Sequence, residues 1–504
     1  MHATPTFTRE PLGALDKKSL ISIVLAMQEQ NARLQDQISG LQGQVIRLDR
    51  QVALLDADNR ALRDQLAQNS RNSSKPPSSD GYAKPSPKSL RAKGQRRTGG
   101  QPGHKGHTLE QVAQPDRVVV HPVERCPECQ MDLGGVPVAE RQRRQVFDLP
   151  PVRLEVTEHQ AEIKRCPGCR HRAHGTFPDG VTQPTQYGSR LRAVAVYLNA
   201  YQLLPWKRTC DLLSDLFGHR PSAALLRDAA SRVVEQIAAS LLSIRESLKA
   251  APVVHADETG LRVAGKLHWL HTAGTPELTY YEVHPRRGRE AMQTMGVLPA
   301  VRGYLAHDGW SPYFQWTQCA HALCNAHHLR ELRFLQEEHG EAWAGELAAL
   351  LCEMKEAVET ARWVGVLRPE ARAVWEHRYD LLLERGRAAH PPSQAPPSGR
   401  RGRTRQSKGR NLLDRLEKHK SSVLAFAHDL RVPFDNNLAE RDLRMMKVKQ
   451  KVSGVFRTLV GASTFCAIRS YLSTVRKHGN DALQALQDAL LGNPFIPVTT
   501  SRAE

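Results

Sequence analysis

The chain is 504 residues long, and its 71 Lys and Arg residues outnumber its 52 Asp and Glu residues, giving a formal net charge of +19. A chain of this length is expected to fold as three or more units, and so large a cationic surplus favours a polyanionic partner such as nucleic acid. The composition argues against a membrane protein, since no stretch approaches the roughly 20 apolar residues of a spanning helix, and against a disulfide framework, since the 9 cysteines occur without a secretion signal.

The pattern of residues changes along the chain and predicts a multidomain α+β protein. The N-terminus does not resemble a signal peptide, because charged residues interrupt it from Arg9 onward, so we expect a cytoplasmic, nucleoid-associated protein of bacterial type. Five regions are predicted: a leucine-zipper-like coiled coil (18–68), a basic linker (69–118), a zinc-ribbon-like module (119–180), a helical region (181–250) and an α/β region (251–500).

Residues 27–66 carry an unbroken heptad pattern. One core position of the heptad holds Asn31, Ile38, Val45, Val52, Asn59 and Leu66, and the other holds Met27, Leu34, Leu41, Leu48, Leu55 and Leu62. β-Branched residues at the first position with Leu at the second favour a parallel two-stranded coiled coil, in which the Asn residues would pair and fix the register. This predicts a homodimer; one long helix packed against its own chain is the alternative.

Residues 69–118 are too rich in Gly, Pro, Ser and basic residues to form a core. A solvated linker explains most of this composition. Some of its cations could instead contact DNA phosphates, since a flexible basic segment can follow a polyanionic backbone. The candidates are Lys93, Arg96, Arg97 and Lys105.

The next region contains two CxxC motifs, Cys126-Pro-Glu-Cys129 and Cys166-Pro-Gly-Cys169. Four thiolates in two pairs suit tetrahedral Zn²⁺, and the segments 144–149 and 152–156 between them alternate like the strands of a hairpin. We therefore predict a zinc ribbon with a structural ion, to which His171 or His174 could also be a ligand. Redox-active or unliganded cysteines are the alternative, but two Pro-containing CxxC turns are seldom redox sites.

From about residue 187 to 249 the apolar spacing becomes helical, with runs at 191–198, 209–217 and 223–248. A helix-turn-helix that reads DNA and a plain helical connector both fit this region, because periodicity is its only signal.

The α/β region contains predicted strands at 253–256, 267–272, 278–283, 303–307 and 320–323, with a predicted helix between the third and fourth. This order predicts a ribonuclease-H-like sheet. In that fold the first strand is central, an antiparallel hairpin lies on one side of it, and the fourth strand lies parallel on the other. Other sheets share the same order.

Three acidic residues stand where such a fold could gather them. Asp257 and Asp308 directly follow the first and fourth predicted strands, and Glu440 lies at the start of a predicted helix. Their carboxylates could hold two Mg²⁺ (or Mn²⁺) ions, which activate an attacking oxygen and stabilise a leaving oxygen on phosphorus. Each residue has another interpretation. Glu258 could be the ligand in place of Asp257. Asp308 could open a turn, and Glu440 could pair with Arg444 on a helix surface.

Four motifs follow one another in this region: His-Ala-Asp-Glu-Thr-Gly at 255–260, His-Asp-Gly-Trp-Ser-Pro-Tyr at 307–313, Cys-Asn-Ala-His-His-Leu-Arg-Glu-Leu at 324–332 and Asn-Asn-Leu-Ala-Glu-Arg-Asp-Leu-Arg at 436–444. They resemble those of the insertion-sequence-66 family of bacterial transposases. The likeness extends to the heptads, the Gly-rich basic stretch at 99–107 and the CxxC motifs. It implies a DDE transposase whose catalytic, metal-binding triad is Asp257, Asp308 and Glu440.

The resemblance implies cleavage of double-stranded DNA at the ends of an insertion sequence, after which each freed 3′-OH attacks target DNA. Residues 449–457 differ from the Arg-Lys-Asn-Trp-like stretch of many relatives and resemble a subgroup encoded without accessory proteins. Two other functions remain open. A zinc-ribbon coiled-coil DNA-binding regulator would not need the three acids, and a ribonuclease-H-like nuclease would cut without joining.

Basic residues follow Glu440 on the same predicted helix and could bind phosphates near the cut. They are Arg441, Arg444, Lys447, Lys449 and Lys451. Asn436 or Asn437 could cap this helix or contact the DNA backbone. The long separation between Asp308 and Glu440 predicts a helical insertion at about 329–431.

Other residues of this region have weaker signals. Cys324 and His327, at CxxH spacing, could indicate a metal, but we interpret them as structural, with His327 able to lie near the scissile phosphate. Trp269, Trp310 and Phe314 are interpreted as core residues and not as base-stacking residues.

Overall fold

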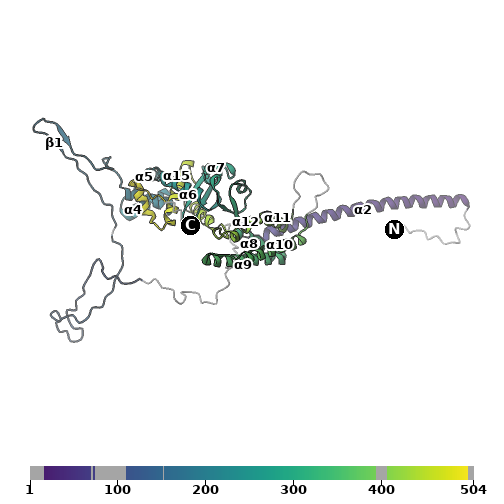
Figure 1. The fold of residues 1–504 in the computed structure, drawn as a ribbon, viewed down its shortest axis with the longest axis horizontal. Helices are drawn as coiled ribbons and strands as arrows, with labels where there is room; N and C mark the ends of the chain where they lie inside the picture. Colours follow the sequence, from purple (N-terminus) through teal and green to yellow (C-terminus); the bar gives the residue numbers. More distant parts are fainter. Residues whose placement is uncertain (1–15, 70–71, 74–108, 151, 393–405, 498–504) are drawn as a thin grey trace. The chain divides into compact units, whose positions relative to one another are not determined.

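The computed structural model describes residues 16–69, 72–73, 109–150, 152–392 and 406–497 (Figure 1). The chain divides into two compact units. The first contains the described parts of Met1–Pro85, His327–Met354 and Arg368–Lys418, and the second contains those of Ser86–Ala326, Lys355–Leu367 and His419–Glu504. Within the described residues, no helix combines the length and the apolarity needed to cross a lipid bilayer.

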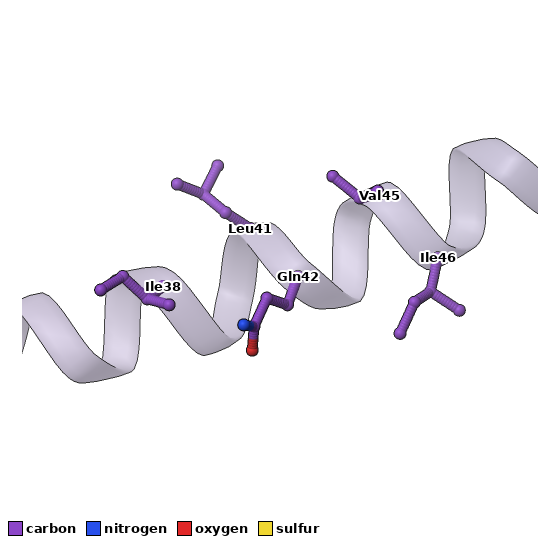
Figure 2. Close-up of a pocket in the computed structure, with 5 residues that line it drawn as sticks. All are labelled: Ile38, Leu41, Gln42, Val45 and Ile46. Atoms are coloured by element: carbon purple, nitrogen blue, oxygen red, sulfur yellow. The ribbon is translucent and has the colours of Figure 1, made fainter.

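The first unit begins with one continuous helix, α2 (Lys17–Ala67), coloured purple in Figure 1. The Asp16 side chain caps it by accepting a 2.8 Å hydrogen bond from the backbone N–H of Ser19. The heptad residues leave an apolar stripe on its surface, where Leu41 and Val45 are 60% and 55% exposed. Figure 2 shows Ile38, Leu41 and Val45 of this stripe, with Gln42 and Ile46 beside them on the helix.

The predicted insertion is helical. It contains α8 (Asn325–His339), α9 (Ala342–Val364), α10 (Pro369–Ala389) and α11 (Lys408–Lys418), most of which belong to the first unit. The helices pack through buried contacts, as where the Tyr379 hydroxyl donates a 3.0 Å hydrogen bond to the carbonyl oxygen of Leu416. The end of α2 is anchored here through Asp64, whose carboxylate lies 3.1 Å from His339 Nε2 and 3.4 Å from Lys408 Nζ.

The second unit opens with the two CxxC motifs, where regular structure is sparse. A short antiparallel hairpin, β1 (Ile163–Arg165) and β2 (Arg172–His174), frames the second motif. The strands predicted at 144–149 and 152–156 do not form. Alternating apolar residues such as Val146 and Val156 are 90% and 89% exposed, so no neighbouring surface stabilises their pairing. The hairpin predicted between the two motifs is therefore wrong.

The helical region contains α3 (Ser189–Val196), a π-helical turn η2 (Tyr197–Tyr201), α4 (Trp206–Phe217), α5 (Ala223–Gln236) and α6 (Ala238–Ala250). The third predicted run is divided at Ile237, whose side chain is fully buried between α5 and α6. Ala193 of α3 and Val233 of α5 share one apolar cluster with the C-terminal helices, so this region is part of the same core as the sheet.

A five-stranded sheet is central to the second unit, with the order β5-β4-β3-β6-β7. Its strands are β3 (Val253–Val263), β4 (Lys266–Gly274), β5 (Thr279–His284), β6 (Tyr304–His307) and β7 (Ala320–Leu323). As predicted, β3 pairs antiparallel with β4 and parallel with β6. Gly303 lets β6 start close beside β3, because a Cβ there would lie 2.2 Å from the carbonyl oxygen of Pro252.

Helices cover both faces of this sheet. The face with Leu261 and Val263 packs against α3, α5, α14 (Asn437–Ser453), α15 (Leu459–Lys477) and α16 (Ala482–Leu490). The face with Val254 and Ala256 packs against α6 and α7 (Arg289–Met295). Two short helices, α12 (Lys420–Val423) and α13 (Ala425–His428), lie beside β7. Because side chains alternate along a strand, positions 255 and 257 face α14, whereas position 258 faces the side of α7.

Candidate active site

Asp257 lies on β3, and Asp308 directly follows β6, the parallel neighbour of β3. In the pairing of β3 with β6, His255 is opposite Ala306, so the same register puts Asp257 opposite Asp308, directly after the last residue of β6. Adjacent strands are about 4.8 Å apart, and equivalent positions share a face of the sheet. The fold therefore brings together two carboxylates that are remote in the sequence.

The turn after β6 holds the Asp308 side chain. Gly309 has a φ of 89°, in the left-handed region that favours glycine. The backbone N–H of Trp310 donates a 2.9 Å hydrogen bond to Asp308 Oδ1, and the backbone N–H of Gly309 donates a 3.0 Å hydrogen bond to His307 Nδ1. Asp308 therefore does open a turn, as the alternative interpretation predicted. The turn orients one of its carboxylate oxygens, and the residue stays exposed.

Asn436 fixes the start of α14 against the sheet. This residue is 1% exposed. Its Oδ1 lies 2.8 Å from Nδ1 of His255, and its Nδ2 donates a 2.8 Å hydrogen bond to the carbonyl oxygen of Ala256. The backbone N–H of Asn436 donates to Sγ of Cys324 at 3.2 Å. Glu440 follows one helical turn later, so its position depends on this anchor.

The pKa of Asp257 reflects the presence of all three acids. Burial raises this pKa well above its ordinary value, and the adjacent charge of Glu258 raises it further. The carboxylates of Asp308 and Glu440 also raise it, so both lie within electrostatic range of Asp257. Within the described residues, neither aspartate forms an ion pair with a basic side chain. Carboxylates without a cationic partner are the donors that Mg²⁺ and Mn²⁺ prefer.

Glu258, the alternative ligand, lies on the other face of the sheet and is already engaged. Its side chain is 1% exposed. Its Oε1 accepts hydrogen bonds from Nε and Nη2 of Arg287 at 2.9 and 2.6 Å, and its Oε2 accepts one from the hydroxyl of Tyr313. Burial raises the pKa of Glu258, while these hydrogen bonds lower it. The geometry therefore favours Asp257 over Glu258 as a metal ligand.

Arg287, in the loop between β5 and α7, was not predicted as a site residue from the sequence. Its Cζ lies 4.7 Å from the ring centroid of Trp269 and 4.0 Å from that of Trp310. Both indoles are half-buried, so they are not purely core residues as predicted. No sequence signal connects these positions, which lie in separate elements. We call Glu258, Trp269, Arg287 and Trp310 the Arg287 cluster.

Cys324 directly follows β7 and lies near the acids. Its Sγ and a carboxylate oxygen of Glu440 are within 4.8 Å of one another. The hydrogen bond from the backbone of Asn436 agrees with a structural role for Cys324. His327 lies within the first turn of α8, and its proposed place near the scissile phosphate stays a prediction.

Arg441, Arg444 and Lys447 form an exposed row on α14, three residues apart and therefore on one side of the helix. Lys449 does not belong to this row, although we predicted a DNA contact for it. It is 9% exposed, and its Nζ lies 3.9 Å from the ring centroid of Phe456. Burial lowers the pKa of Lys449 to about 8. The other predicted DNA contacts, Lys93, Arg96, Arg97 and Lys105, lie outside the described residues.

The two CxxC motifs adopt the same local structure. The residue after each motif, Gln130 or Arg170, has a left-handed φ of 59° or 63° and donates a 2.9 Å hydrogen bond to the carbonyl oxygen of the first cysteine. A backbone hydrogen bond from the second cysteine lowers the pKa of Cys126 and of Cys166, which favours the thiolate that binds zinc. Among the residues that the structure describes, none of these cysteines belongs to a set of three metal-ligating side chains whose ligand atoms lie within 4.8 Å of one another. The two cysteine pairs therefore do not come together in this structure.

Three family models match the chain. The one described as the transposase IS66 family covers residues 184–464, which is more than half of the chain. The zinc-finger binding domain of transposase IS66 matches residues 124–170, which contain both CxxC motifs. A family of unknown function, DUF6444, matches residues 25–110. No match was found among curated proteins.

Proposed function

Because the chain belongs to the IS66 family of transposases, we propose that it cuts DNA at the ends of an insertion sequence and joins those ends to target DNA. The observation that carries this proposal is the register of β3 and β6, which puts Asp257 opposite Asp308, together with the anchoring of α14, the helix of Glu440, to β3 through Asn436. The strand order of the sheet also supports a ribonuclease-H-like catalytic domain.

We assign Asp257, Asp308 and Glu440 to the binding of two Mg²⁺ or Mn²⁺ ions. When bound, these ions would supply the activation of an attacking oxygen and the stabilisation of a leaving oxygen on phosphorus. The chain's own contribution is placement: the register of β3 and β6 aligns the aspartates, and Asn436 anchors the helix that carries Glu440. Burial, and then the neighbouring carboxylates, raise the pKa of Asp257, and bound cations would stabilise its ionised form.

In our proposal, DNA is held near this site by the exposed row that Arg441, Arg444 and Lys447 form. The row follows Glu440 directly on α14, and the net charge of +19 provides long-range attraction for DNA. Lys449 is not included, because its ammonium group is buried against Phe456. Arg96, Arg97 and Lys105, which lie outside the described residues, keep their predicted role as phosphate contacts.

Two further assignments concern the N-terminal regions. Cys126, Cys129, Cys166 and Cys169 bind one structural Zn²⁺ in this proposal, supported by the zinc-finger match over 124–170. The apolar stripe of α2 pairs with the same stripe of a second copy, since Asn31 and Asn59 occupy the same heptad position as Ile38, Val45 and Val52. Such a dimer would bring two element ends together.

The test uses the purified full chain and duplexes that carry the inverted repeats flanking its reading frame, with a supercoiled plasmid as target. The proposal expects free 3′-OH ends and joined products with Mg²⁺, and neither product with EDTA. Cutting without joining would indicate a nuclease instead. Binding without cutting, unchanged when Asp257 and Asp308 are replaced by Asn, would indicate a DNA-binding regulator.

A further inference from the structure

The guanidinium group of Arg287 is fixed in one orientation. Trp269 and Trp310 contact it at ring-centroid distances of 4.7 and 4.0 Å, and Glu258 accepts hydrogen bonds from its Nε and Nη2. Cation–π contacts and a charge-assisted ion pair together orient a planar guanidinium far better than its flexible stem does. The conformational entropy that a ligand would otherwise have to offset has largely been lost already.

One edge of this guanidinium group remains for a ligand. Nε and Nη2 are directed to Glu258, whereas Nη1 makes no hydrogen bond to any residue in the described part of the chain. The Arg287 side chain is 39% exposed, although that of Glu258 is only 1% exposed. The pair therefore presents a partly solvated cation above a buried anion. A phosphate oxygen is the acceptor that suits the outer edge of an arginine.

Contacts through Trp310 link Arg287 to Asp308, and its ion-pair partner Glu258 is next to Asp257 in the chain. Trp310, whose ring contacts Arg287, also donates its backbone N–H to Oδ1 of Asp308 at 2.9 Å. Glu258, the ion-pair partner of Arg287, is the residue after Asp257, and the charge of Asp308 helps to raise the pKa of Glu258. A ligand on the outer edge of Arg287 would thus lie close to the acids.

Arg287 and the basic row on α14 approach the acids from opposite faces of the sheet. Asp257 shares its face with His255, which contacts Asn436 at the start of α14. Glu258 shares its face with Ala256, which packs in the cluster that contains α7. A DNA strand crossing the sheet at the two aspartates would have Arg441 and Arg444 on one side and Arg287 on the other.

We infer that Arg287 binds one backbone phosphate of the DNA strand next to the cleavage point, and that Trp269, Trp310 and Glu258 hold it ready to do so. This inference rests on the proposed function, because it takes the acids to mark the cleavage point. It adds a phosphate-binding residue from the side of the sheet opposite α14.

The test replaces single phosphates in the DNA. Each duplex carries the element end with one uncharged methylphosphonate at a different position around the cut, and binding to the full chain is measured without Mg²⁺. We expect one position at which the wild type loses about tenfold in affinity. Arg287→Ala should bind the unmodified duplex about tenfold more weakly and lose the methylphosphonate effect at that position alone. For Arg287→Ala, the slope of log affinity against log salt concentration should also become shallower, by about the amount that one phosphate contact contributes.

Arg286→Ala is the matched control. It removes the same charge from the neighbouring residue, whose side chain is 73% exposed and pairs with Glu290 on the surface. This variant should keep the wild-type methylphosphonate profile. Since Arg287→Ala leaves the buried Glu258 without its cation, the double variant Arg287→Ala/Glu258→Gln is measured as well, and its profile should match that of Arg287→Ala.

The outcomes separate this inference from the proposed function. If both Arg287 variants respond to the methylphosphonate at every position as the wild type does, the inference is overturned, even if the wild type cuts and joins DNA. A wild type that never cuts with Mg²⁺, but whose sensitivity at one position disappears with Arg287, would refute the proposed function and keep the phosphate contact. A wild type that does not bind these duplexes contradicts both.

Discussion

Asp257 of β3 lies opposite Asp308, which directly follows the parallel strand β6, although the β4–β5 hairpin and α7 separate the two residues in the sequence. The hairpin fills one side of β3, so the chain returns to the other side through α7 and forms β6 there. The second aspartate consequently raises the pKa of the first.

Asp308→Asn should leave DNA affinity within about twofold and lower the rate of Mg²⁺-dependent strand transfer by more than about 100-fold. The amide keeps the shape of the side chain and can still accept the hydrogen bond from Trp310, but it loses the charge that binds a cation. Binding is measured by fluorescence anisotropy and joining on gels. Asp215→Asn, an exposed change on α4, is the control. Joining at the wild-type rate by Asp308→Asn would rule out the assigned role.

Asp257→Asn should stabilise the metal-free protein at neutral pH. The pKa of Asp257 is raised in the folded state, so the native chain binds the proton more tightly than the unfolded chain does. Its stability therefore falls as the pH rises from about 4 through the raised pKa. Removing the charge should raise the unfolding temperature at pH 7 by on the order of 2–4 °C, with little effect at pH 4.

Differential scanning calorimetry in EDTA tests this expectation, and added Mg²⁺ should stabilise the wild type but not Asp257→Asn. Asp215→Asn, at an exposed position of α4, is the control. That substitution should leave the unfolding temperature unchanged. A metal-free Asp257→Asn protein less stable than the wild type at pH 7 would contradict the argument.

The sequence predicted the strand order of the sheet and the placement of the two aspartates beside each other, because both depend on local pattern. Apolar runs mark β6 and the start of β3, and Asp257 and Asp308 stand directly after those runs, although β3 continues past Asp257 to Val263. Glu440 came from a motif, since periodicity alone does not separate it from a surface charge. The order of the elements then left few ways to arrange the strands.

What could not be predicted depends on contacts between distant segments. The hairpin predicted at 144–156 fails because the described residues there have no apolar surface to pack against. Lys449 lies in a basic run, but the side of α14 that carries it packs against Phe456 and Phe465. Arg287 had no signal, because its two indoles come from β4 and from the turn after β6.

Asn436→Ala should destabilise the catalytic unit by about 2–3 kcal/mol, because it leaves the buried His255 and the carbonyl oxygen of Ala256 without their partner. It should also reduce strand transfer more than DNA affinity, since the start of α14 is no longer fixed. Urea denaturation and joining rates measure the two effects. Asn437→Ala, at the exposed next position, should cost less than about 0.5 kcal/mol. Equal effects of the two substitutions would count against the anchor.

Cys129→Ser should lower the zinc content from about one ion per chain to nearly none. Zinc requires thiolates, so the wild type should also lose its ion as the pH falls, together with the folded structure of this module. Atomic absorption gives the zinc content, and limited proteolysis reports on the folding of residues 119–180. Cys352→Ser, an exposed cysteine of α9, should keep the zinc. A wild-type chain purified without zinc and unaffected by chelators would end this assignment.

Leu41→Asp/Val45→Asp should convert a dimer into a monomer of 56.3 kDa. These residues are 60% and 55% exposed on α2 alone, so a second helix is needed to remove them from water. Burying the introduced carboxylates would cost more free energy than burying the apolar stripe provides. The control, Ser39→Asp/Ala53→Asp, adds the same charges off the stripe and should stay dimeric. Light scattering after size exclusion gives the mass. In the monomer, joining of paired ends should fall while cutting of single ends persists, because each acidic site lies within one chain. A wild type that is itself monomeric would contradict the proposed dimer.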